Sequence, residues 1–112
     1  MNKIIIIGSG GHARACLDII NSQKKFKFSG FIDNTSKDKK VIGKDKDLKK
    51  ISKRIKFACI GFGGFKNSVK RVNFFLKLKK IGFKLPVIKS SEAYVSKSAK
   101  IGEGSIIMHG AI

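Results

Sequence analysis

A run of β-branched residues that ends in a glycine cluster limits the folds open to this chain. Residues 3–7 include four consecutive isoleucines, a pattern typical of a strand buried on both faces of a parallel sheet. The sequence GSGG follows at residues 8–11, and apolar residues then recur at helical spacing over residues 12–22. These apolar residues are Ala13, Cys16, Leu17 and Ile20. The segment predicts a strand, a glycine turn and a helix that packs on the sheet.

The same alternation of strand and helix continues to about residue 82. Further strands are predicted at residues 28–32 and 57–60, and the polar, lysine-rich stretch that reaches residue 46 predicts a surface loop. A short helix is expected at residues 47–51, and a longer one between Ser68, a favourable N-cap residue, and Gly82, a favourable C-cap. The residues expected on its buried side are Val69, Val72, Leu76 and either Leu78 or Lys79. This order predicts an α/β fold with a Rossmann-like open parallel sheet and flanking helices.

After Pro86 the sequence changes to a repeat of six residues. Val95, Ile101 and Ile107 are six residues apart, and a small residue lies two positions before each of them. The small residues are Ala93, Ala99 and Ser105, and Ala111 continues the series. A six-residue period is typical of a β-helix, whereas two ordinary strands joined at residues 102–104 would also produce it. We therefore expect an α/β domain at residues 1–88 and a different unit at residues 91–112.

The glycine loop carries the motif that points most directly to a ligand. Gly8, Gly10 and Ala13 complete the pattern G-x-G-x-x-[GA] between a predicted strand and a predicted helix. In such loops the first glycine permits a tight turn, the second lets a ligand approach the backbone, and the start of the helix favours a phosphate. Asp33 ends the second strand, where an acidic residue binds a ribose or base in such folds. We predict a nucleotide or nucleotide-sugar site, with a ligand-free tight turn as the alternative.

The charge balance suggests an additional class of partner. With 25 basic and 7 acidic residues the chain has a formal net charge of +18, which is typical of proteins that bind nucleic acid. Only three of the basic residues are arginines, however, and lysine is spread along nearly the whole chain beside abundant isoleucine, as a codon bias would leave it. We do not expect a nucleic-acid partner, although a small basic nucleic-acid-binding protein stays open as an alternative.

The remaining composition excludes several classes of protein. No apolar stretch has the length of a transmembrane helix or a signal peptide, so we expect no membrane association and a cytoplasmic location. Cys16 and Cys59 lack CxxC spacing, which argues against a zinc site or a disulfide framework and favours two small buried side chains. His12 and His109 have no recognisable catalytic partner, so we assign no catalytic residue and no metal ligand.

Several short motifs occur together along the chain. They are the loop GSGGH at residues 8–12, FIDN at 31–34, VIG at 41–43, ACIG at 58–61 and the hexads after Ala93. In this combination the chain resembles, over essentially all of its 112 residues, the N-terminal part of the NeuD/PglD family. That family comprises sialic-acid O-acetyltransferases and bacillosamine-type sugar N-acetyltransferases, which act in surface glycan biosynthesis.

The resemblance implies a fold of two parts and a set of site residues. An N-terminal α/β domain would bind a UDP- or CMP-linked sugar, and a left-handed hexapeptide-repeat β-helix would bind acetyl-CoA between the subunits of a homotrimer. The residues implied for the nucleotide-sugar site are Gly8, Gly10, Gly11, His12, Asp33, Asn34, Gly61 and Lys66. Asn34 replaces a common second acidic residue, Lys66 a common arginine, and Lys89-Ser90 a frequent His-Pro.

The resemblance also implies limits on what these residues do alone. The catalytic histidine of the family belongs to a later turn of the β-helix, and the sequence ends at Ile112 within a repeat. We therefore expect a shortened chain, a monomer or weak oligomer, that binds nucleotide-sugar weakly or not at all and transfers no acetyl group. An NAD-dependent oxidoreductase is the alternative enzyme, because the glycine pattern and Asp33 also fit NAD, but no second mononucleotide-binding half follows.

Overall fold

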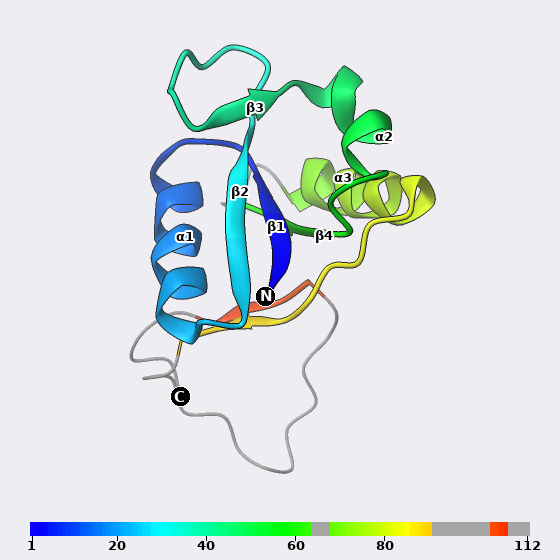
Figure 1. Cartoon of the computed structure of the whole chain (residues 1–112). Helices are drawn as coiled ribbons and strands as arrows, with labels where there is room; N and C mark the ends of the chain where they lie inside the picture. The colour runs from blue at the N-terminus through cyan, green and yellow to red at the C-terminus, as the bar shows by residue number, and fades with distance from the viewer. Residues whose placement is uncertain (64–67, 91–103, 108–112) are drawn as a thin grey trace.

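The computed structural model describes residues 1–63, 68–90 and 104–107, and its centre is a four-stranded parallel sheet with helices on both faces (Figure 1). The strands lie in the order β3-β2-β1-β4, which matches the first four strands of the classic Rossmann order 3-2-1-4-5-6. They span Asn2–Ile7 (β1), Phe26–Ile32 (β2), Val41–Gly43 (β3) and Phe57–Ile60 (β4). The helical segments are α1 (Gly11–Gln23), the 3-10 turn η1 (Asp45–Asp47), α2 (Leu48–Ile51) and α3 (Ser68–Ile81). The predicted Rossmann-like sheet is confirmed.

The isoleucines of β1 explain why the sheet carries helices on both faces. Ile4 and Ile6 pack in the same cluster as the buried residues of α1, whereas Ile5 and Ile7 pack with Leu48 of α2 and Leu78 of α3. Successive strand residues point to opposite faces, so an uninterrupted apolar run supplies both layers of the core. All four side chains are almost fully buried, which contributes about 2 kcal/mol each.

The stretch predicted as a loop up to residue 46 contains two short elements. β3 pairs in parallel with the end of β2, and η1 follows before α2. The amide of Phe31 donates to the carbonyl of Lys40, and the amide of Asp33 donates to the carbonyl of Gly43. Backbone hydrogen bonds hold this edge strand, and a strand of three residues is too short to show a side-chain period. The prediction of an irregular loop there is therefore wrong.

The long C-terminal helix of the sheet domain also packs differently from the prediction. Val69, Val72 and Leu76 are exposed by 71%, 57% and 59%, so their prediction as buried residues is wrong. Of the alternatives Leu78 and Lys79, Leu78 is buried and Lys79 is exposed. The residues that pack on the sheet core are Phe74, Phe75, Leu78 and Ile81. The helix is apolar on both sides, and the side with two phenylalanines buries the larger area.

The predicted end of α3 at Gly82 is confirmed. Gly82 has a φ of +119°, and its amide donates to the carbonyl of Lys79 while the amide of Phe83 donates to that of Leu78. These two bonds form a Schellman cap, which satisfies carbonyls that the last turn leaves without partners.

The remaining described residues form a second, two-stranded parallel sheet. β5 (Ile88–Lys89) pairs with β6 (Ile106–Ile107), which lies 18 residues further along the chain. Ile88 is buried in the core cluster beside α1, and Ile106 packs against that cluster. Of the hexad positions, Ser105 and Ile107 belong to the described residues. Ala93, Val95, Ala99, Ile101 and Ala111 lie outside them, as does His109.

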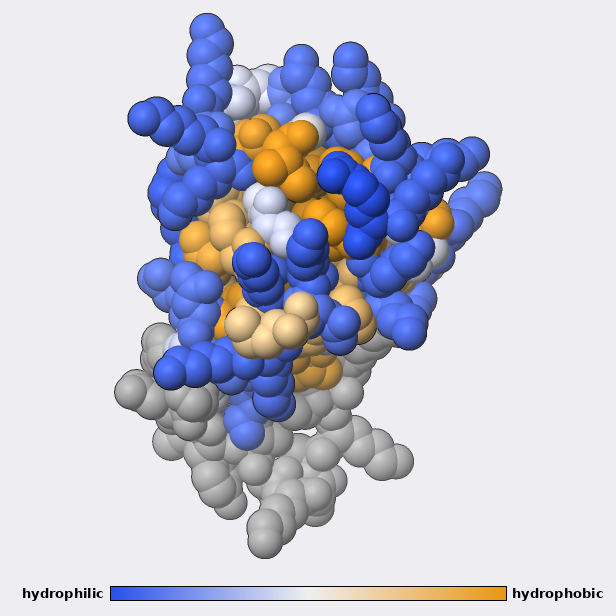
Figure 2. All heavy atoms as spheres, in the orientation of Figure 1, coloured by the Kyte–Doolittle hydropathy of each residue, from blue (hydrophilic) through white to orange (hydrophobic). Residues whose placement is uncertain are grey.

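The surface is rich in charged side chains, whereas the two cysteines are internal. The face seen in Figure 2 is covered mainly by hydrophilic residues with smaller apolar areas between them. Cys16 of α1 and Cys59 of β4 are buried, as predicted, and they lie in the same core cluster. Their mutual hydrogen bond, together with burial, raises the pKa of Cys59. Within the described ranges, no helix has the length and apolar character needed to cross a membrane.

Candidate functional site

A cavity of about 370 Å³ opens at the carboxyl edge of the central sheet. The sheet order changes direction between β1 and β4, and open α/β sheets bind ligands in the crevice outside such a point. The cavity is lined by the ends of β1 and β2, the loop after β4 and one side of α3. Its lining residues are Ile7, Gly8, Ile32, Asp33, Asn34, Thr35, Asp45, Phe62, Lys70 and Phe74.

Two of the predicted glycines shape this edge for different reasons. Gly8 has a φ of +96°, which L side chains rarely adopt, and its amide donates to the carbonyl of Ile32 at 2.7 Å. Gly61 is required by packing, because a Cβ there would lie 2.4 Å from Cγ2 of Ile6 and 2.9 Å from Cβ of Ala13. Gly8 lines the cavity, whereas Gly61 is buried where β4 approaches α1.

Gly10 and Gly11 have no such structural requirement. Both are exposed at the start of α1, neither has a positive φ, and a Cβ on either would meet no atom within 4 Å. Gly10 is the N-cap, and no side chain caps the helix or places a carboxylate in its first turn. The amides of the first turn therefore remain accessible to an anion, which the helix dipole favours.

Of the two remaining predicted site residues, the structure describes His12 but not Lys66. His12 is exposed on the first turn of α1, and its Cε1 lies 3.2 Å from the position that a Cβ on Gly63 would take. The imidazole is thus beside the backbone that follows β4, at the same edge as the glycine loop. Lys66, which the resemblance adds to the site, lies outside the described residues.

Asp33 joins the glycine loop to the turn after β2. Its Oδ1 accepts hydrogen bonds from the amides of Thr35 at 2.9 Å and Ser36 at 3.0 Å, and its Oδ2 accepts one from Oγ of Ser9 at 2.8 Å. These donors, the Thr35 amide first, lower the pKa of Asp33 from 3.8 to about 2. The carboxylate is therefore ionised at neutral pH, and much of its acceptor capacity is used within the protein.

Asn34 links the same turn to η1. The amide of Asp45 donates to Oδ1 of Asn34 at 2.9 Å, and Nδ2 of Asn34 donates to Oδ2 of Asp45 at 3.3 Å. This contact brings a second carboxylate to the cavity wall. The sequence suggests Asp45 only as an acidic residue near the start of the short helix expected at residues 47–51, and no sequence motif points to it as a cavity residue.

The sequence motifs did not indicate three of the cavity residues, two on α3 and one on the loop after β4. Lys70 and Phe74 line the cavity from α3, and Phe62 lines it from the loop after β4. The rings of Phe62 and Phe74 form an edge-to-face pair with centroids 5.8 Å apart. Because the opposite side of α3 was predicted to face the core, Lys70 and Phe74 were not identified as cavity residues. Only the position of Phe62, directly after the strand and Gly61, could have suggested it.

The arrangement is suited to binding a polar, anionic ligand. An open helix N-terminus, a lysine, two carboxylates and a pair of aromatic rings are gathered at one edge of the sheet. In the part of the chain that the structure describes, no group of three or more His, Cys, Asp and Glu side chains is placed to hold a metal ion. We assign no nucleophile or acid-base pair to this cavity.

The sequence profile of the PglD N-terminal domain matches residues 3–78, which include every strand of the central sheet. The chain belongs to the PglD N-terminal domain family. Its glycine loop, the Asp33 turn and most of α3 all lie within the matched range. A search of curated proteins found no sequence that matches the chain.

Solved structures of two acetyltransferases share the fold of this chain. PerB from Caulobacter crescentus, crystallised with CoA and GDP-perosamine, has a TM-score of 0.87 and 24% identity over 98% of this chain and 53% of its own. The acetyltransferase domain of PglB from Neisseria gonorrhoeae, in complex with acetyl coenzyme A, has a TM-score of 0.83 and 28% identity over 96% and 53%. The present chain thus spans about half the length of these two proteins.

A more distant structural similarity concerns the sheet fold alone. The DAP dehydrogenase of C. glutamicum, in complex with DAP, has a TM-score of 0.55 and 16% identity over 69% of this chain. At that identity the similarity shows a shared Rossmann-like arrangement and carries no information on the ligand of this PglD N-terminal domain.

Proposed function

We propose that this chain is the nucleotide-sugar-binding part of a sugar acetyltransferase. The whole enzyme would transfer an acetyl group from acetyl-CoA to a hydroxyl or amino group of a nucleotide-activated amino sugar or sialic acid. The match of residues 3–78 to the PglD N-terminal domain carries this proposal. The cavity at the carboxyl edge, with the open start of α1 beside it, supplies a physical reason for it.

The cavity suits a nucleotide in size and in the distribution of its polar groups. Its volume of about 370 Å³ lies within the range of small-molecule sites, roughly 300 to 1,000 Å³. We propose that the phosphates lie near Gly10 and Gly11, whose lack of side chains leaves the helix amides open. The ribose or base would then face Asp33 and Asn34 at the end of β2. His12, Gly61 and Lys66 complete the proposed set of site residues.

The pairing of β5 with β6 supports a proposal for the C-terminal residues. The two strands are parallel and 18 residues apart, which equals three hexads, or about one turn of a β-helix. We propose that residues 91–112 begin a left-handed β-helix after a sheet domain at residues 1–88. Homotrimer formation and acetyl-CoA binding belong to that proposal, and we assign none of the described residues to acetyl-CoA.

Isothermal titration calorimetry of the chain with UDP, GDP, CMP and NAD at moderate salt tests the nucleotide proposal. We expect a nucleoside mono- or diphosphate to bind more tightly than NAD. Gly10→Ala should weaken that binding about tenfold without unfolding the chain, because a Cβ has room in the fold but obstructs a ligand at the backbone. Asn21→Ala, on the exposed side of α1, is the control. Because a shortened chain is expected to bind weakly, the titration extends to millimolar ligand concentrations. Preference for NAD, or no binding of any of the four in that range, would contradict the proposal.

A further inference from the structure

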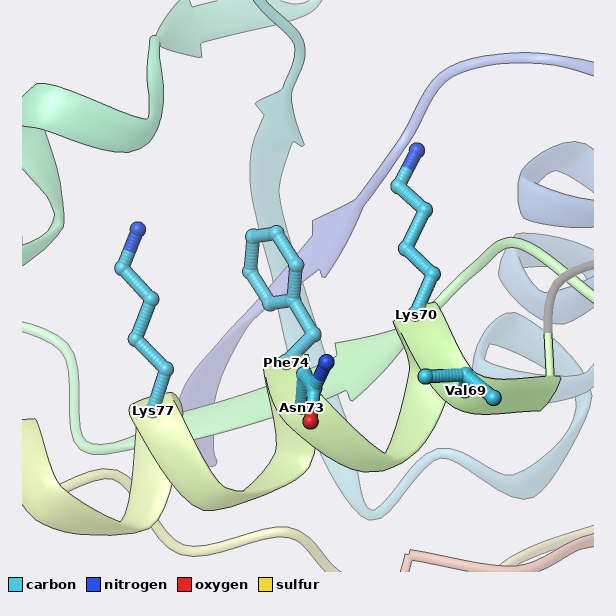
Figure 3. A pocket seen from close by; sticks show the side chains of 5 residues that line it. All are labelled: Val69, Lys70, Asn73, Phe74 and Lys77. Atoms are coloured by element: carbon cyan, nitrogen blue, oxygen red, sulfur yellow. The ribbon is translucent and has the colours of Figure 1, made fainter.

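One side of α3 carries two lysines, Lys70 and Lys77, of which only Lys70 is part of the cavity lining. Lys70, Phe74 and Lys77 are spaced along the same side of the helix, and Figure 3 shows their side chains extending in the same direction. Lys70 and Phe74 line the cavity at the carboxyl edge together with Gly8 and Asp33. Lys77 is not part of that lining, and it borders a neighbouring hollow of about 380 Å³ that is also lined by Lys70, Phe74, Val69 and Asn73.

An aromatic ring holds the amino group of Lys70 in position. Nζ lies 4.8 Å from the centroid of the Phe62 ring, a distance typical of a cation–π contact. Phe62 in turn packs edge to face on Phe74. Lys70 is exposed at the rim of the cavity, and its amino group lies over the ring of Phe62.

The carboxylates of the cavity do not neutralise this lysine. Among the described residues none forms an ion pair with Lys70. Asp33 is bound by Ser9, Thr35 and Ser36, and Asp45 contacts Asn34. Lys70 is therefore a cation at the cavity that no described carboxylate neutralises.

We propose that Lys70 binds a phosphate group of the nucleotide from the α3 side of the cavity. This inference rests on the function proposed above and adds a residue that neither the sequence motifs nor the family resemblance indicated. The ammonium group is a compact charge with three donors, so it can pair with phosphate oxygens without a fixed geometry. The phosphates would lie between this cation and the open amides at the start of α1, while the nucleoside faces Asp33 and Asn34.

Lys70→Gln and Lys77→Gln form a matched pair of variants for testing this inference. Both lysines lie on the same side of α3 and over a phenylalanine ring, since Nζ of Lys77 is 5.3 Å from the Phe74 centroid. The affinities to be measured calorimetrically are those of the best-bound nucleoside diphosphate and of its nucleoside. We expect Lys70→Gln to raise the Kd of the diphosphate about tenfold and that of the nucleoside less than about twofold. Lys77→Gln should leave both within about twofold, and Lys70→Arg should retain most of the diphosphate affinity.

The outcomes separate this inference from the proposed function. If the unaltered chain binds the diphosphate but Lys70→Gln binds it equally well, only the role of Lys70 is overturned. The same holds if the two glutamine variants weaken binding equally, or if the nucleoside is affected as much as the diphosphate. If the unaltered chain binds no nucleotide, the proposed function fails and this inference fails with it.

Discussion

Replacing Asp33 by asparagine should destabilise the fold in a manner that depends on pH. The carboxylate accepts hydrogen bonds from Ser9, Thr35 and Ser36, and these donors hold its pKa at about 2, against an ordinary value of 3.8. That difference corresponds to at most about 2.4 kcal/mol of folding free energy. Because the carboxylate is partly exposed to solvent, we expect Asp33→Asn to cost about 1 kcal/mol at pH 7.

The sign of the pH dependence follows from the lowered pKa. The folded state binds the proton of Asp33 less readily than the unfolded chain does, so its contribution is complete above the unfolded pKa of about 4. The contribution is lost as the pH falls from about 4 to about 2. The difference in unfolding free energy between the original chain and Asp33→Asn should therefore shrink over that interval.

Urea denaturation followed by circular dichroism at pH 7 and at several values between 5 and 2 measures this difference. Asp18→Asn is the matched control, because Asp18 is exposed on α1 and should show little change at any pH. A variant as stable as the original chain at pH 7 would refute the reasoning. So would a difference that stays constant down to pH 2, because the loss would then come from something other than the ionised carboxylate.

Three further predictions concern packing, helix start and the C-terminal segment. Gly61→Ala should lower stability by about 2 kcal/mol or more in urea denaturation, because its Cβ would collide with Cγ2 of Ile6 at 2.4 Å; an unchanged midpoint would contradict this packing. Gly11→Ala should leave the thermal midpoint unchanged or higher while weakening nucleotide binding, since alanine favours helix and has room there. A lower midpoint would show that Gly11 is needed for folding. Arg71→Met should cost about 1 to 2 kcal/mol, because its guanidinium donates to three carbonyls, including that of Gly104; proteolysis near residue 104 should become faster, and unchanged rates would argue against this link.

The central part of the fold could be predicted because its determinants are local in the sequence. The isoleucine run, the glycine loop and the helix after it each follow from short-range patterns, and the structure confirms them as β1, the turn and α1. The burial of Cys16 and Cys59 was also predicted, since small apolar side chains on those elements face each other across one layer. The glycine motif likewise located the edge of the sheet at which the cavity opens.

The parts that could not be predicted depend on contacts between distant segments. β3 is held to β2 by backbone hydrogen bonds, which leave no side-chain pattern. α3 has apolar residues on both sides, so periodicity alone could not choose between Phe74 and Val72 as the buried one. That ambiguity concealed Lys70, because a cavity residue on a helix can be identified only after its buried side is known.

Val69, Val72 and Leu76 form an exposed apolar stripe on α3. We expect this stripe to favour self-association of the chain at high protein concentration. Copies with a net charge of +18 repel one another at low ionic strength, and this repulsion keeps such stripes apart. Added salt shortens the range of the repulsion to about 8 Å at 0.15 M, close to contact between side chains. Salt would then promote self-association through α3 at the same concentrations that weaken phosphate binding. Purification and storage of the chain therefore favour dilute, low-salt buffers.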